Sequence, residues 1–104
     1  MNEQNEPFAL EIKPSDLFYR YRRNKEERDE ADFLGKPDPR PFDRNDLYQV
    51  LSMLEAVMVA IESRDGDVLH RVEEIMVQEL PIFVCSREDV YDCLVAAMRG
   101  ELGH

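Results

Sequence analysis

The residue types in this chain that could carry chemistry are few outside its many carboxylates. Asp67 and His70 form an Asp-x-x-His pair, distantly like the carboxylate-x-x-His pairs that supply ligands in di-iron helical bundles. Such a centre needs a second pair and two more inward-facing carboxylates, whereas His70 falls on the polar side of its expected helix. The pattern therefore favours a helix-capping Asp67 and a surface His70. We predict no metal site and no bound cofactor.

The two cysteines, Cys85 and Cys93, are eight residues apart. This spacing gives neither a CxxC pair nor a four-ligand zinc pattern, so we expect free thiols in a reducing compartment. Cys85, Cys93 and His70 together remain the basis of one hypothesis, a thiol- or metal-responsive regulator.

Nucleophilic catalysis lacks a matching motif. The chain contains no Gly-x-Ser-x-Gly sequence, no phosphate-binding glycine loop and no Cys–His pattern. Glu55 and Glu62 are too far apart on one helix to act as a coupled pair. Glu79 projects close to an apolar face, which indicates either a helix end or a contact with an arginine across an interface. We predict that the protein is not an enzyme and has no catalytic residues.

An aromatic and basic cluster occupies residues 18–23, with the sequence FYRYRR. Aromatic rings beside arginines can hold single-stranded nucleic acid or a phosphate group, here through Tyr19, Arg20, Arg22 and Arg23. The alternative is that Phe18 and Tyr21 anchor a helix while the arginines pair with carboxylates.

The charge of the chain weighs against nucleic acid as a partner. The net charge is −10, and residues 45–104 contain 12 acidic against 4 basic side chains. Such a balance opposes binding to polyanions and anionic membranes, and it favours basic partners. No apolar run approaches the ~20 residues that span a bilayer, and the first residues do not resemble a secretory signal. We expect a cytoplasmic protein that binds no membrane.

Residues 47–61, LYQVLSMLEAVMVAI, organise the expected fold. Apolar side chains recur at helical spacing along one stripe: Leu47, Val50, Leu51, Leu54, Val57, Met58 and Ile61. We expect this central helix to start from a cap at Asp43 and to run to about Arg64. Its opposite side carries a second apolar face: Tyr48, Met53, Ala56, Val59 and Ala60.

Two more amphipathic helices are expected after it. Asp65-Gly66-Asp67 is typical of a turn, with Gly66 at a positive φ and Asp67 as the cap of a helix that ends at Pro81. Ser86 is expected to cap the last helix, and Gly100 to close it.

The first part of the chain has a different character. Residues 8–12 alternate like a short extended segment, a charged helix is expected from Asp16 to about residue 34, and GKPDPRPF is a proline-rich linker. We therefore divide the chain into an N-terminal arm, 1–42, and a helical core, 43–104.

The predicted fold class is all-α, a three-helix core with a charged N-terminal helix and a short extended segment. The alternative is α+β, with residues 8–12 and 81–85 paired as two strands.

The function favoured by these patterns is a small acidic interaction or regulatory module. Exposed apolar faces usually mark interfaces, so we predict a protein partner, and we expect a homodimer formed through the second apolar face of the central helix. The alternatives are a nucleic-acid or phosphate-ligand binder through residues 18–23 and the thiol- or metal-responsive regulator.

Overall fold

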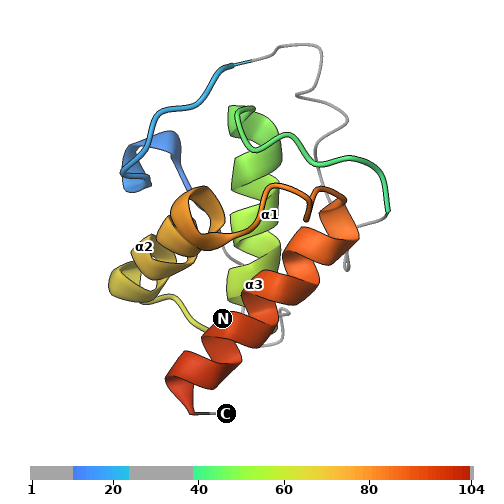
Figure 1. The fold of residues 1–104 in the computed structure, drawn as a ribbon. Coiled ribbons are helices and arrows are strands. Elements are labelled where there is room, and N and C mark those ends of the chain that lie inside the picture. Colours follow the sequence, from blue (N-terminus) through green and yellow to red (C-terminus); the bar gives the residue numbers. More distant parts are fainter. Residues whose placement is uncertain (1–10, 24–38, 104) are drawn as a thin grey trace, which may run out of the picture.

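The computed structural model describes residues 11–23 and 39–103, and this part of the chain is mostly helical. Its α-helices are α1, Leu47–Ala60, α2, Gly66–Glu74, and α3, Arg87–Leu102. A 3₁₀ turn, Pro14–Asp16, precedes them, and a π-helical turn, Ile75–Glu79, continues α2. α1 packs against both α2 and α3 and stands between them in Figure 1. The predicted all-α fold class, a small helical bundle, is confirmed.

The apolar stripe predicted on α1 lies at the centre of the core. All of its members are buried except Leu51, which is half-buried. α2, the π-helical turn and α3 bury their own apolar faces around it: Leu69, Val72, Ile75, Met76, Val90, Leu94, Val95 and Met98. Ile12 and Phe42 join the same core, so the described residues of the arm pack against the helices. The division at residue 42 stays a prediction.

The start of α1 differs from the prediction. Its N-cap is Asp46, whose carboxylate accepts a hydrogen bond from the Gln49 N–H at 2.9 Å. Asp43, the predicted cap, instead accepts from the Asn45 N–H at 2.8 Å and so forms a turn before the helix. The helix also ends at Ala60, short of the predicted residue 64.

The other helix ends also correct the prediction in part. Asp65, not Asp67, caps α2, and its carboxylate accepts from the Asp67 N–H at 2.8 Å, so Gly66 is the first helical residue. Ser86 caps α3 as predicted. The predicted stop at Gly100 is wrong, because α3 passes through it and ends at Leu102, followed by the C-cap Gly103 in the left-handed conformation (φ 79°) that favours glycine.

Residues 11–23, which we call the strap, form no α-helix. After the 3₁₀ turn the chain bends at Phe18 and Tyr19 and forms no helix, so the charged helix predicted from Asp16 is wrong as far as residue 23; its remaining residues, 24–34, lie outside the described part. The backbone groups of Arg22 pair with the start of α1: its N–H donates to the Asn45 carbonyl and its carbonyl accepts from the Leu47 N–H, both at 2.6 Å. These tertiary bonds replace the bonds that a helix would make within itself.

The alternative α+β pairing finds no support in the described residues, which contain no strand. The Ile12 N–H donates to the Glu55 carboxylate at 2.8 Å, not to a partner strand. Residues 81–85 form the α2–α3 loop, where the Cys85 carbonyl accepts from the Phe42 N–H at 2.7 Å. Residues 8–10 lie outside the described part.

Candidate functional site

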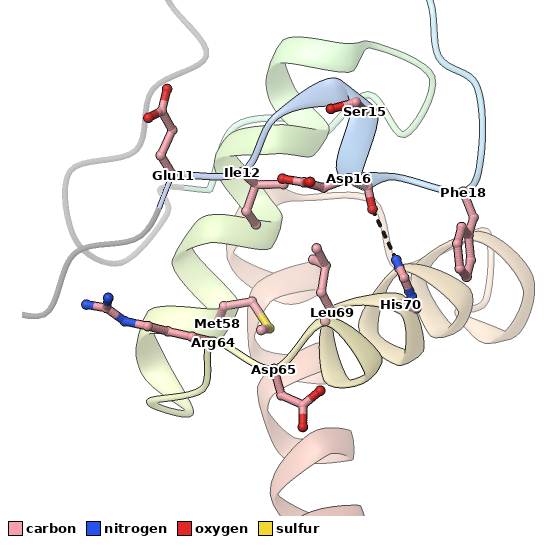
Figure 2. A pocket seen from close by; sticks show the side chains of 11 residues that line it. Glu11, Ile12, Ser15, Asp16, Phe18, Met58, Arg64, Asp65, Leu69 and His70 are labelled. Carbon is pink, nitrogen blue, oxygen red and sulfur yellow. Dashed lines mark hydrogen bonds between the residues drawn. The ribbon is translucent and has the colours of Figure 1, made fainter.

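A groove of about 500 Å³ separates the strap from α1 and α2. Figure 2 shows Ile12 from the strap, Met58 from α1 and Leu69 from α2 converging on it, and all three are buried. Arg64 and Glu11 lie at its rim and point away from this floor (Figure 2). The groove therefore has an apolar floor and a charged rim, and its volume suits a small ligand or an apolar side chain.

The strap is held over this groove by a carboxylate that sequence analysis missed. Glu73 on α2 is fully buried (0% exposed), and it accepts hydrogen bonds from the N–H groups of Phe18 at 3.0 Å and Tyr19 at 3.1 Å. It also accepts from the Tyr21 hydroxyl at 2.7 Å. Burial raises the pKa of Tyr21, and the hydrogen bond to Glu73 raises that pKa further. Three donors thus satisfy a carboxylate that would otherwise be costly to bury.

The signal for Glu73 was present in the sequence. It lies four residues after Leu69 and three before Met76, in the middle of the apolar face of α2. A carboxylate at such a position needs buried donors, and its presence indicates that another segment supplies them.

His70 lies at the edge of the groove and contacts the strap. Its Nε2 donates to the Asp16 carbonyl at 3.1 Å, and its ring stacks on Phe18 with the centroids 3.6 Å apart (Figure 2). Asp67 is exposed and does not cap the helix. Among the described residues, no group of three His, Cys, Asp or Glu side chains is placed to hold a metal.

The aromatic and basic cluster at residues 18–23 separates into two sides of the strap. The Tyr19 hydroxyl accepts from Gln78 Nε2 at 2.6 Å, and Tyr21 is held by Glu73. Arg20, Arg22 and Arg23 are exposed. The tyrosines therefore bind α2 and the π-helical turn, and the arginines face solvent. Tyr21 anchors the strap, although not as part of the predicted helix, whereas the Phe18 side chain stacks on His70 and stays 71% exposed.

The second apolar face predicted on α1 is only partly accessible. Met53 is fully buried within this one chain, because the rest of the molecule covers it. Tyr48, Ala56 and Ala60 are half-buried, and Val59 is 36% exposed. Met53 therefore cannot take part in an interface of this folded chain, and Val59 is the most accessible member of the face.

Among the residues that the structure describes, the most exposed large apolar side chains lie elsewhere, in the α2–α3 loop. Ile82 is 89% exposed and Phe83 is 80% exposed. We call this pair the loop tip. Sequence analysis considered these residues only as part of a possible strand. The loop conformation that exposes them is held by hydrogen bonds from the distant Arg44, and a local sequence pattern does not reveal such contacts.

The Arg44 side chain fixes the loop through hydrogen bonds to backbone carbonyl groups. Its Nη1 donates to the carbonyls of Met76 at 3.3 Å and Leu80 at 2.9 Å, and its Nη2 donates to those of Pro81 and Val84, both at 2.6 Å. Partial burial lowers the pKa of Arg44. A cation thus satisfies carbonyl groups at the end of a helix, where the helix dipole favours it.

The remaining predicted groups also have defined places. Cys85 and Cys93 are free thiols, as expected, and both are exposed; their response to oxidants stays a prediction. Glu79 meets Arg71 at 2.7 Å, and Arg71 also binds Glu74 and Glu101, so it joins the end of α2 to the end of α3. Glu79 thus pairs with an arginine of its own chain.

Comparison with known proteins adds no relative. No protein-family model, curated protein or solved structure matches this chain. Within the described residues, every helix is too short or too polar to cross a bilayer.

Proposed function

We propose that this protein is a non-catalytic protein–protein interaction module, and that the loop tip, Ile82 and Phe83, is its anchor. The exposure of these two adjacent large side chains is the observation that supports the proposal. Aromatic and aliphatic side chains that enter a partner's pocket contribute most of the binding free energy in many interfaces. The free, exposed thiols fit the cytoplasmic location that we also propose.

The rigidity of the loop supports this role. Arg44 binds carbonyl groups on both sides of the tip, at Leu80 and Pro81 before it and at Val84 after it. Pro81 restricts the backbone further. A loop already fixed in one conformation loses little entropy on binding, so the tip can bind more tightly than a mobile loop with the same side chains.

The charges around the loop tip indicate the kind of partner. Glu88 and Asp89 follow the loop tip in the sequence, and the whole chain has a net charge of −10, whereas Glu79, which precedes it, pairs with Arg71. We therefore propose a partner protein with an apolar pocket bordered by lysine or arginine side chains.

Site-specific photo-crosslinking tests this proposal. A benzophenone amino acid in place of Phe83 is expected to give a discrete adduct with a partner in the native host. The matched control places the same amino acid at Ala96, which is exposed on α3, and gives no such adduct. The adduct is expected to disappear when Ile82→Ser is added, since the pocket must accept both side chains.

Other outcomes are equally clear. The same adducts at positions 83 and 96, or an adduct unaffected by Ile82→Ser, would show nonspecific contact and contradict the proposal. An adduct of twice the chain mass would identify a second copy as the partner. A second copy bound through α1 is the alternative predicted from the sequence, but Val59, the most exposed residue of that face, is only 36% exposed, so a different protein is the favoured partner.

A further inference from the structure

We propose that the strap carries a separate binding site for a compact oxyanion, a phosphate group. The site is an open hollow of about 370 Å³ lined by Arg20, Tyr21, Arg22 and Asn45. It shares no lining residue with the loop tip, so it does not depend on the function proposed above.

The positions of the two arginines are fixed by their backbone. Arg22 is bonded on both sides to residues at the start of α1, to Asn45 and Leu47. Tyr21 lies between the two arginines in the sequence, and its hydroxyl donates a hydrogen bond to the Glu73 carboxylate at 2.7 Å. In an extended segment, alternate residues point the same way. Arg20 and Arg22 therefore face outward together, while Tyr21 turns inward between them.

The lining has the chemistry that an oxyanion needs. Each guanidinium offers a planar fork of N–H donors that matches phosphate geometry, and the Asn45 side chain offers an amide donor. Among the residues that the structure describes, no carboxylate lines the hollow. The nearby Asp46 carboxylate is buried and accepts from the Gln49 N–H.

The same geometry argues against single-stranded nucleic acid. A base-stacking surface needs accessible aromatic faces beside the basic groups. Here Tyr19 and Tyr21 are half-buried, with their hydroxyls bonded to Gln78 and Glu73. Phe18 is 71% exposed, but its ring stacks on His70 and does not line the hollow. A chain with a net charge of −10 also repels a polyanion more strongly than a single phosphate group.

An NMR titration tests the site with three probes at low ionic strength: inorganic phosphate, a phosphoserine peptide and a single-stranded oligonucleotide. We expect phosphate to shift the Arg20, Arg22 and Asn45 resonances in a saturable way that chloride does not reproduce. Tighter binding of the phosphoserine peptide would identify a phosphorylated protein as the source of the group. Equal binding would identify free phosphate.

Two variants that each remove one positive charge are compared, and one of them is the control. Arg22→Gln is expected to weaken phosphate binding about tenfold or more, because it removes one charge-assisted pair. Arg23→Gln removes the neighbouring charge, which does not line the hollow, and is expected to leave the affinity within about threefold. Retained amide dispersion shows that both variants are folded. No saturable shift, equal losses in the two variants, or binding of the oligonucleotide alone would overturn the proposal.

Discussion

At the scale of single residues, one carboxylate decides where the first part of the chain goes. Glu73 has no contact with water, and its three donors all come from the strap, at Phe18, Tyr19 and Tyr21. If the strap did not donate these hydrogen bonds, the carboxylate would be buried without donors to replace those of water, which is strongly unfavourable. Without the carboxylate, two backbone N–H groups would lose their partners. The strap and α2 therefore stabilise each other.

Replacing Glu73 with Gln is expected to lower the free energy of unfolding by about 1.5–3 kcal/mol, the range for hydrogen bonds to a charged group. The amide retains one acceptor oxygen and places an NH₂ group against donors. Urea denaturation followed by circular dichroism measures the change. The control is Glu74→Gln, next in the chain, where an exposed carboxylate pairs with Arg71 and a change within about 0.5 kcal/mol is expected. Equal effects at the two positions would contradict the role of Glu73.

At the scale of elements, the sequence predicts the helices well and the segment before them poorly. The stripe on α1 and the cap at Ser86 are correct because periodicity and capping are local properties. The strap is missed because its conformation depends on Glu73 and on the start of α1, which are distant in the chain. Of the candidate sites, residues 18–23 were identified from their composition, whereas the loop tip depends on the distant Arg44. A period of two at Leu17, Tyr19 and Tyr21, which are all half-buried, was the available signal.

Two glycines at element ends give opposite predictions. Gly66 has an ordinary helical conformation and open space around it, so Gly66→Ala is expected to raise the free energy of unfolding by about 0.4–1 kcal/mol through the unfolded state. Gly103 also has open space but a φ of 79°, so Gly103→Ala is expected to lower it by about 1 kcal/mol. Urea midpoints of the two variants test this. Stabilisation by both, or by Gly103→Ala alone, would contradict the assigned conformations.

At the scale of the whole molecule, the open question is whether a second copy is the partner. In the predicted dimer face, Met53 is buried within its own chain, and Val59 is the most exposed residue. A stable interface buries at least about 1,000 Å² in total, far more than Val59 or the two side chains of the loop tip provide alone. A net charge of −10 on each copy adds repulsion.

We therefore expect light scattering at micromolar concentration to give the monomer mass of 12.2 kDa, both at low salt and at a salt concentration that screens the repulsion. A doubled mass would contradict this and would show that a second copy is a partner. Two variants would then locate the contact, since Val59→Arg places a charge on the face of α1, whereas Ile82→Ser with Phe83→Ser removes the loop tip. Restoration of the monomer by Val59→Arg alone would assign the contact to α1. If only the loop-tip variant restores the monomer, the loop tip is a self-association surface. It would then not be the anchor for a different protein, because the same side chains cannot bind both partners at once.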